Sequence, residues 1–221
     1  MSRSDSATRP ATAAVEAFRA GEPVLVYDAG DREAEVDMVV PPRAVDAATV
    51  ARLRNDAGGL VCVALDDAVA ESFDLPFLAD ALDHPAAATG ELGYDDRASF
   101  SLPVNHRETH TGVTDADRAL TVSALGDAAA DPAGTDFADT FRVPGHVHVL
   151  RAAPGLLGDR RGHTELGVAM ARAADRAPAA VVCEMLDDRT GGARSVADAR
   201  AYADAHELVF VEGADLVAEL A

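Results

Sequence analysis

Short apolar runs recur along this chain, and they restrict its fold more than any other feature of the sequence. Runs of four to eight such residues lie at 24–27, 60–65, 179–186 and 208–211, and this is the length of a strand buried on both faces. A segment with helical periodicity precedes the first run at 8–20, where Val15 and Phe18 share one side before Gly21 ends the pattern. The sequence therefore predicts a sheet covered by helices.

Capping and turn residues predict the remaining elements. Polar residues that can cap a helix are Asp46, Asp66, either Thr114 or Asp115, and Thr164. Two alternating runs, 98–104 and 146–150, are predicted strands, and Pro103 suits an edge strand or a bulge. Further predictions are an irregular connection over 75–97, a surface loop over 126–140, a helix to about 174, a helix over 196–206 and a short helix at the C-terminus.

Strands and helices interleave without strict alternation, which assigns the chain to the α/β class, α+β-like, with a mixed β-sheet and helices packed on its faces. The 221 residues, 48% of them hydrophobic, are enough for one well-buried core. We therefore expect a single domain over residues 1–221, with residues 1–7 frayed.

The charge balance excludes some partners and indicates a habitat. Against 38 Asp and Glu there are 19 basic residues, all arginine, for a formal net charge of −19. Such a chain lacks the basic footprint of a nucleic-acid-binding protein, and no stretch is apolar enough to cross a membrane or serve as a signal peptide. We expect a cytoplasmic protein adapted to high salt, where screening reduces the repulsion between surface carboxylates.

Residues 28–37 concentrate five carboxylates, one arginine and a glycine directly after the first predicted strand. If this segment stays extended, Glu33, Glu35 and Asp37 project from one face, and a hard divalent cation would relieve their repulsion. The alternative is a solvated acidic loop, which is common in an acidic chain. The spacing does not fit an EF-hand, because Glu33 stands where that loop needs glycine.

Three other places could carry chemistry. Glu184 lies in an apolar run, where burial could raise its pKa into the range of a general acid or base, unless it merely ends the strand. Residues 160–164, Arg-Arg-Gly-His-Thr, offer guanidinium groups and free helix N-terminal amides for an anion, although a basic pair before a helix is often only a surface feature. His146 alternates with Val147 and can face one side of its strand, although a buried structural histidine would do the same. Nucleotide-binding, serine-hydrolase and cysteine zinc motifs are missing from the sequence.

In this order, four motifs resemble those of the 3,4-dihydroxy-2-butanone 4-phosphate synthase family of riboflavin biosynthesis. They are residues 31–37 (DREAEVD), 111–121 (TGVTDADRALT), 144–150 (PGHVHVL) and 160–165 (RRGHTE) followed by Glu184. The resemblance runs from about Val24 to the C-terminus. It implies a lyase that converts D-ribulose 5-phosphate into L-3,4-dihydroxy-2-butanone 4-phosphate and formate through a metal-stabilised enediolate.

The resemblance also implies the roles of individual residues. Glu33 and His163 would ligate magnesium or manganese, with two divalent ions per site and no organic cofactor. His146, Glu184 and Asp37 would assist catalysis. Substrate would contact Arg32, Glu33, Asp37, Thr111, Arg160, Arg161, Gly162, His163, Thr164 and Glu184. By family analogy the enzyme is a homodimer with its sites at the subunit interface.

The chain departs from the family pattern in three respects, and two rival readings stay open. Residues 146–150 read His-Val-His-Val-Leu where the family typically has an aromatic residue and a proline, which alters the packing near His146 but keeps the histidine. Val36 stands where the family usually has glycine, which predicts a stiffer acidic loop. The chain also ends where many bacterial relatives continue into a GTP cyclohydrolase II domain, so we expect a monofunctional enzyme. The rivals are another metal-dependent sugar-phosphate lyase or isomerase, and a non-catalytic acidic protein that binds divalent ions.

Overall fold

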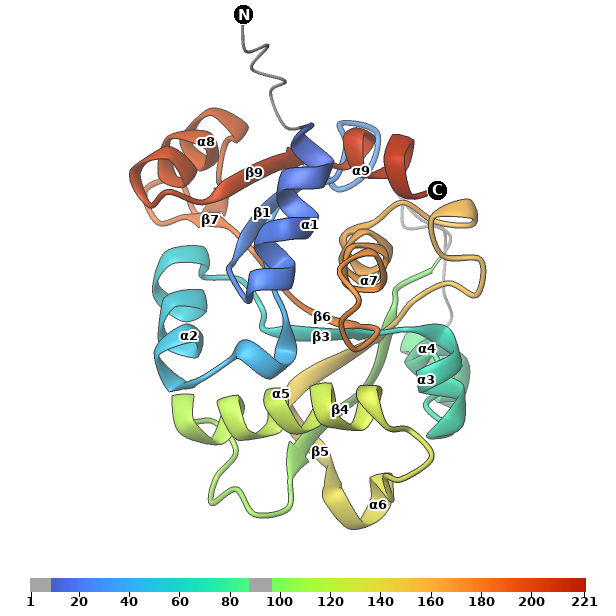
Figure 1. The fold of residues 1–221 in the computed structure, drawn as a ribbon. Coiled ribbons are helices and arrows are strands. Elements are labelled where there is room, and N and C mark those ends of the chain that lie inside the picture. The colour runs from blue at the N-terminus through green and yellow to red at the C-terminus, as the bar shows by residue number, and fades with distance from the viewer. Residues whose placement is uncertain (1–8, 88–96) are drawn as a thin grey trace, which may run out of the picture.

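A mixed, seven-stranded β-sheet forms the centre of the computed structural model, which describes residues 9–87 and 97–221 (Figure 1). The strands are β1 (Val24–Tyr27), β2 (Val36–Val40), β3 (Cys62–Leu65), β4 (Phe100–His106), β5 (Phe141–Arg151), β6 (Ala179–Glu184) and β9 (Val209–Glu212), in the order β4-β5-β3-β6-β2-β1-β9. The pairs β1–β9 and β3–β5 are parallel and the other neighbours are antiparallel. The predicted mixed sheet is therefore confirmed. A small hairpin of β7 (Leu186–Asp187) and β8 (Gly192–Ala193) lies apart from it.

Helices cover both faces of this sheet because successive strand residues point to opposite sides. In β6, Val181 and Cys183 pack on one side with residues of α2 (Ala47–Arg52), α3 (Asp67–Ser72), α5 (Asp115–Ala130) and α8 (Val196–Ala205). Ala180 and Val182 pack on the other side with α1 (Pro10–Ala20), α7 (His163–Ala173) and α9 (Gly213–Leu220). The remaining helical segments are α4 (Leu78–Ala81), α6 (Phe137–Thr140), η1 (Pro42–Ala44), η2 (Leu53–Ala57), η3 (Pro85–Ala87) and η4 (Leu156–Gly158).

Several helix starts form where the capping residues predicted them. The side chains of Asp46, Asp66 and Thr114 each accept a backbone N–H of the helix that follows, at 2.8, 3.1 and 3.1 Å. Pro103 lies on β4, the edge strand, beside an irregularity in its pairing with β5. A proline is tolerated at both kinds of position because it has no N–H to donate to a neighbouring strand.

Other predicted boundaries are wrong. The predicted loop over 126–140 is largely helical, since α5 continues to Ala130 and α6 follows; alanine has the highest helix propensity, and it outweighs the polarity of this stretch. Gly162, rather than Thr164, is the N-cap of α7. Residues 36–40 form a buried strand that the acidic character of the preceding loop concealed. The predictions for residues 1–7 lie outside the described residues, as do residues 88–96 of the predicted connection.

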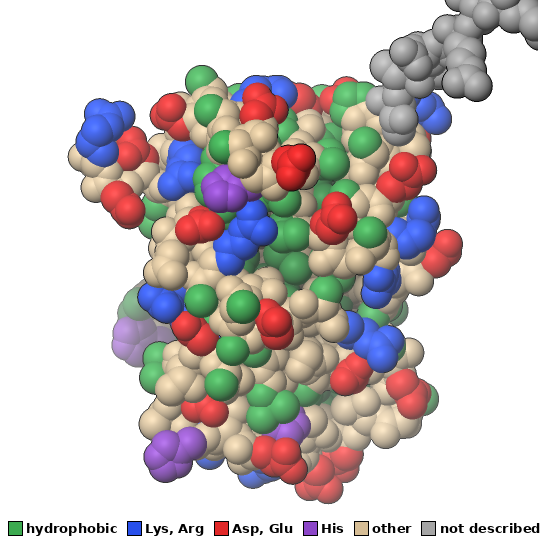
Figure 2. All heavy atoms as spheres, turned by 60° about the vertical axis from the view of Figure 1, so that its left-hand side comes forward, with side chains coloured by type: hydrophobic (Ala, Val, Ile, Leu, Met, Phe, Trp, Pro, Cys, Tyr) green, Lys and Arg blue, Asp and Glu red, His purple; other side chains and the backbone are tan. Residues whose placement is uncertain are grey.

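Acidic side chains, with arginines among them, are spread over the face of the molecule that Figure 2 shows. Within the described ranges, none of the helices combines the length and the apolar character needed to cross a membrane.

Candidate active site

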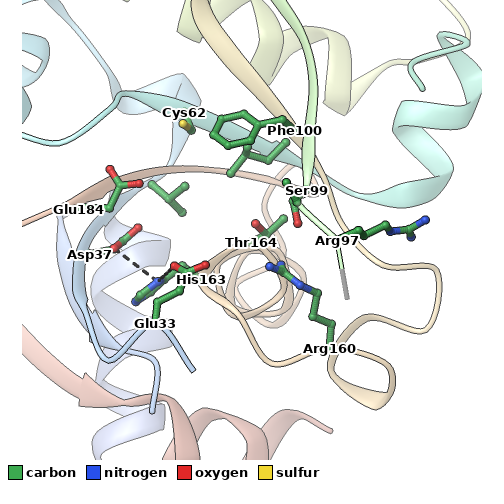
Figure 3. A pocket seen from close by; sticks show the side chains of 13 residues that line it. Glu33, Asp37, Cys62, Arg97, Ser99, Phe100, Arg160, His163, Thr164 and Glu184 are labelled. Atoms are coloured by element: carbon green, nitrogen blue, oxygen red, sulfur yellow. Dashed lines mark ion pairs between the residues drawn. The ribbon is translucent and has the colours of Figure 1, made fainter. Parts of the chain in front are cut away.

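Two adjacent strands bring carboxylates to the same face of the sheet. Asp37 on β2 lies directly opposite Glu184 on β6 in the strand register. Because side chains alternate along a strand, Asp37 shares the face of Val39, and Glu184 that of Val182; this is the face that packs against α7. His163, the first residue of α7, lies beside them (Figure 3). The pocket there is lined by Glu33, Asp37, Cys62, Arg97, Ala98, Ser99, Phe100, Leu150, Arg160, His163, Thr164, Val182 and Glu184.

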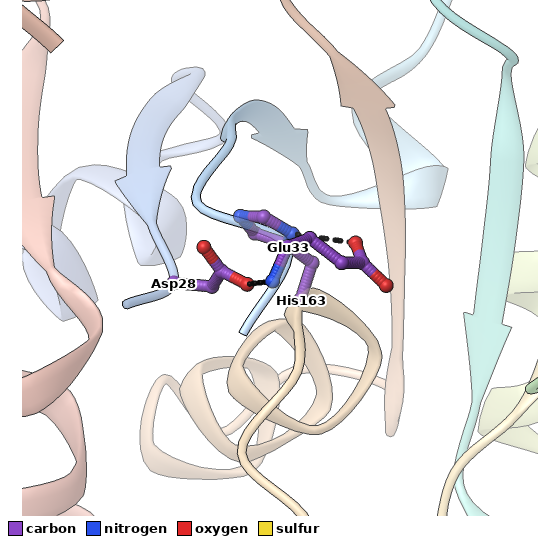
Figure 4. A group of neighbouring side chains, drawn as sticks. All are labelled: Asp28, Glu33 and His163. Carbon is purple, nitrogen blue, oxygen red and sulfur yellow. Dashed lines mark hydrogen bonds and ion pairs between the residues drawn. The ribbon is translucent and has the colours of Figure 1, made fainter. Parts of the chain in front are cut away.

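The acidic loop turns back on itself between β1 and β2, and Asp28 holds the turn. The buried Asp28 carboxylate accepts the backbone N–H of Glu33 at 2.9 Å (Figure 4). It also accepts the backbone N–H of Glu35 at 3.1 Å. Ala34 between them has φ 58°, a left-handed conformation that non-glycine residues adopt only when surrounding contacts enforce it. The segment is therefore not extended before Val36, and Glu33 reaches His163 through a turn.

His163 has one ring nitrogen fixed and the other turned toward carboxylates. Its Nε2–H donates to the carbonyl oxygen of Val26 at 3.1 Å. Its Nδ1 lies 3.4 Å from Asp37 Oδ1 and 3.7 Å from Glu33 Oε2. Among the described residues, neither His163 Nδ1 nor Asp37 Oδ1 has a hydrogen-bond partner, although both atoms are buried. Two buried polar atoms that face each other in this way can be satisfied by a proton on the imidazole or by a bound cation.

The electrostatics of this cluster also indicate a shortage of positive charge. Burial raises the pKa of Asp37 to about 8, and the nearby carboxylates of Glu184 and Glu33 add to the shift. Burial disfavours the charged form of His163, but the facing carboxylates, chiefly Asp37 and Glu33, outweigh it and raise the pKa of the imidazole to about 9. The contact with His163 lowers the pKa of Glu33. A divalent cation would replace protons in such a group.

The residues present fit a divalent metal ion. Ligand atoms of Asp28, Glu33 and His163 lie within 4.8 Å of one another. Both oxygens of Asp28 already accept backbone N–H groups, so Asp28 also positions the loop. The carboxylates of Asp37 and Glu33 both lie near His163 Nδ1, at 3.4 and 3.7 Å. A metal-binding histidine usually donates its second ring nitrogen to a carbonyl or carboxylate, as His163 does to Val26.

Glu184 is held at the pocket by the segment that leads into β3. The backbone N–H of Leu60 donates to Glu184 Oε2 at 2.9 Å. A Cβ atom on Gly59 would lie only 2.4 Å from the same oxygen, so glycine is required for this approach. Cys62 lines the pocket nearby, and burial raises the pKa of its thiol well above the ordinary value. The thiol therefore stays protonated and forms a passive wall.

The opposite end of the pocket is cationic. Figure 3 shows Arg160 and Arg97 at a distance from the carboxylates of Asp37 and Glu184, with Thr164 between the two ends. Arg160 donates to Glu165 at 2.8 Å, and Arg97 lies 3.4 Å from the centre of the Phe77 ring. The N-terminus of α7 has no side-chain cap in this structure, so its first amides can also bind an anion.

Most of the residues singled out from the sequence meet at this pocket. Glu33, Asp37, Arg160, His163, Thr164 and Glu184 line it. Arg32 precedes Glu33 in the loop, Gly162 caps α7 and Arg161 is exposed beside that cap. Thr111 and His146 are not among the lining residues; Thr111 binds Asp117 at the start of α5, and His146 lies on β5.

Sequence reasoning missed the walls of the pocket and one of its cations. The residues concerned are Cys62, Arg97, Ala98, Ser99, Phe100, Leu150 and Val182. They come from neighbouring strands and from the segment before β4, so only the pairing of the strands brings them together. The one available signal was strand alternation, which places Val182 on the side of Glu184.

Comparison with known proteins gives one consistent result. The family model of 3,4-dihydroxy-2-butanone 4-phosphate synthase matches residues 12–219. The synthase of Methanosarcina mazei is 46% identical over 217 residues, which cover 92% of this chain and 88% of that protein. The synthase of Methanothermobacter thermautotrophicus is 43% identical over 212 residues, with 92% and 93% covered. A crystal structure of a 3,4-dihydroxy-2-butanone 4-phosphate synthase in complex with two magnesium ions matches with a TM-score of 0.79 at 30% identity, over 93% of each chain.

Proposed function

Because this chain belongs to the 3,4-dihydroxy-2-butanone 4-phosphate synthase family, we propose that it is a lyase that converts D-ribulose 5-phosphate into L-3,4-dihydroxy-2-butanone 4-phosphate and formate in riboflavin biosynthesis. The observation that carries the proposal is the pocket itself, with carboxylates and His163 at one end and Arg160 and Arg97 at the other. A sugar phosphate would fit this arrangement, with its phosphate at the arginines and its carbonyl and hydroxyl groups at the carboxylates and His163.

The cationic residues of the pocket would bind the substrate, and the carboxylates would transfer protons. Arg160, Thr164 and the first amides of α7 would bind the phosphate and fix the direction of the chain of carbon atoms. The carbonyl and hydroxyl groups would then face Asp37 and Glu184. Burial raises the pKa of Asp37 to about 8, so this carboxyl group can take up and return a proton. A bound divalent ion supplies a Lewis acid that polarises the carbonyl oxygen and stabilises the charge that develops on it.

We propose magnesium or manganese as the ion, with Glu33 and His163 as ligands and two ions per site. The donor set supports this, because one imidazole among carboxylates suits both ions. A relative of known structure was crystallised in complex with two magnesium ions. The chemistry requires no electron transfer, so we expect no organic cofactor.

The test of the function is a formate assay on the purified protein, with ribulose 5-phosphate and magnesium in high salt. We expect formate to accumulate in equal amount to L-3,4-dihydroxy-2-butanone 4-phosphate, and to stop accumulating when a chelator is added. Isomerisation of the substrate without formate would point to a different reaction at the same site. No reaction from folded, metal-loaded protein would refute the function.

We further propose that the enzyme is a homodimer and that His146 completes the site of the opposite subunit. Two observations support this. His146 is exposed and lies outside the pocket of its own chain. Val113 and Val143 are 53% and 51% exposed, and Arg142, beside Val143, donates to Thr109 and His110 of the segment that leads to Val113. Exposed apolar side chains on adjoining segments are typical of a contact surface.

Mixing two inactive variants tests the shared site. We expect Glu33→Gln and His146→Ala to be inactive alone, but an unfolded and refolded equimolar mixture should recover about a quarter of wild-type activity, because half of the dimers are mixed and each has one intact site. Size-exclusion chromatography with light scattering would verify the dimer. A mixture without any recovery, from protein that refolds to mixed dimers, would place His146 and Glu33 in the site of the same subunit and overturn the shared site.

We propose a salt-adapted host, supported by the excess of 38 Asp and Glu over 19 arginines and the absence of lysine. Raising sodium chloride from about 0.1 to 1 M shortens the screening length from about 10 to 3 Å, so repulsion among the surface carboxylates should fall. We expect the melting temperature to rise with salt over this range. A melting temperature that stays constant or falls would contradict the adaptation.

Two further proposals concern the number of activities that the chain carries and its cellular compartment. We propose that this single domain carries the synthase activity alone, as the names of the two archaeal relatives suggest, of which the chain spans 88% and 93%. We propose that it works in the cytoplasm, where the free thiols of Cys62 and Cys183 would stay reduced.

A further inference from the structure

Asn105 and His146 are joined by two contacts across the β4–β5 pair. The backbone N–H of His146 donates to Asn105 Oδ1 at 2.8 Å. The Nδ2 atom of Asn105 lies 3.1 Å from His146 Nδ1. One amide side chain therefore holds both the backbone and the ring of the same histidine. Asn105 is 3% exposed, whereas His146 is exposed at the surface.

These contacts determine which ring nitrogen carries the proton. A backbone N–H can only donate, so the atom of Asn105 that accepts it is the oxygen, and the other atom of the amide is its NH₂ group. An NH₂ group can only donate, so His146 Nδ1 must accept. The alternative contact, from Nδ1 to Oδ1, is longer at 3.4 Å and involves an oxygen that already accepts a hydrogen bond. The neutral ring thus carries its proton on Nε2.

The backbone around Asn105 leaves room for this side chain and little else. Gly112 has φ +86°, and a Cβ atom there would lie 2.0 Å from Asn105 Nδ2. A Cβ atom on Gly145 would lie 1.8 Å from the carbonyl carbon of Val104. Glycines at both positions allow the two strands and the following turn to close around the amide. The amide cannot rotate freely in this space, so its orientation toward His146 is fixed.

We propose that Asn105 is a positioning residue that holds His146 as the Nε2–H tautomer, with Nε2–H turned away from β4 and available to a substrate oxygen. The role of the histidine in turnover rests on the proposed function, whereas the tautomer follows from the geometry alone. The neutral ring in this state offers a proton at Nε2 and cannot accept one there. Asn105 thereby makes Nε2 of His146 a proton donor and not a proton acceptor.

The direct test is nitrogen NMR of protein labelled with ¹⁵N in its histidine rings, at a pH where the rings are neutral. Comparison with His146→Gln identifies the signals of His146. We expect wild-type protein to show Nδ1 unprotonated and Nε2 protonated. In Asn105→Asp the carboxylate can accept but cannot donate, so the proton should move to Nδ1. In Asn105→Ala both tautomers should be populated.

Turnover gives the second readout. We expect Asn105→Asp to lower kcat by about 10²-fold, the scale of a lost general acid, with the KM for ribulose 5-phosphate within about threefold of wild type. Asn55→Asp, the same change at an exposed asparagine on η2, should leave both constants unchanged. If Asn105→Asp fails to fold, the ¹⁵N signals of His146 in Asn105→Ala test the proposal, and they should show both tautomers.

The outcomes separate the two proposals. An Nε2–H tautomer that persists in both Asn105 variants would overturn the positioning role, whatever the activity. A tautomer that shifts as expected, in a wild-type protein that releases no formate, would leave the positioning role intact and refute the proposed function.

Discussion

Replacing Glu33 by glutamine is expected to abolish metal-dependent formate release, lowering kcat/KM by about 10³-fold or more. The change removes one carboxylate oxygen from the group formed with His163 and Asp37, and it removes one negative charge from the site. The fold should persist, because Asp28 binds the backbone N–H of Glu33 and not its side chain. Calorimetric titration with magnesium should show the matching loss of affinity, and circular dichroism an unchanged spectrum.

Asp31→Asn is the matched control for this variant. It makes the same change of charge two residues earlier in the same loop, at an exposed position. If general electrostatic attraction by the acidic loop were enough to hold the ion, the two variants would behave alike. If Glu33→Gln retained magnesium affinity and turnover, Glu33 would not be a metal ligand. His163 and Asp37 would then be the next residues to test.

The sequence predicted the sheet class and most strand positions because each buried strand is a short apolar run with turn residues beside it. It failed where composition and structure disagree. Residues 36–40 include Asp37, yet they form a fully buried strand. The histidine that faces this carboxylate, His163, lies on a helix far along the sequence. The stretch after Gly126 appeared loop-like from its acidic residues, but its alanines continue α5 to Ala130.

The site residues also divide into those that local motifs identify and those that only the folded chain brings together. Glu33, His163 and Glu184 could be named from motifs, and the fold does bring them to one pocket. The turn that delivers Glu33 depends on Asp28 and on a left-handed residue, Ala34, which no sequence pattern indicates. Arg97 joins the cationic end only because β4 pairs with β5 and places its start beside Leu150, so strand pairing had to be known first.

The Glu165 carboxylate shows how the cationic end is built. Glu165 follows the residues that line the pocket and is 0% exposed. One of its oxygens accepts the backbone N–H of Ala153 at 3.0 Å, and the other accepts Arg160 at 2.8 Å. The Arg160 side chain is 14% exposed, so this ion pair is largely shielded from water. A buried carboxylate thereby fixes the guanidinium that we expect to bind phosphate.

Replacing Glu165 by alanine is expected to lower the free energy of unfolding by about 3–5 kcal/mol, because it removes one partner of a buried ion pair and the acceptor of the Ala153 N–H. Glu165→Gln keeps an acceptor and the side-chain shape, so its loss should be about half as large. Asp127→Ala breaks the ion pair between Asp127 and Arg43, in which the side chains are 65% and 56% exposed. This variant should lower the free energy of unfolding by less than about 1 kcal/mol.

Denaturant unfolding at two salt concentrations would measure all three variants. Salt screens the exposed pair and leaves the buried one almost unaffected, so the difference between Glu165→Ala and Asp127→Ala should persist at 1 M sodium chloride. The affinity for inorganic phosphate should fall in Glu165→Ala, since Arg160 loses the contact that directs it into the pocket. An unfolding free energy within 1 kcal/mol of wild type, with phosphate affinity unchanged, would mean that Arg160 is positioned by other contacts and that the buried carboxylate contributes to neither stability nor binding.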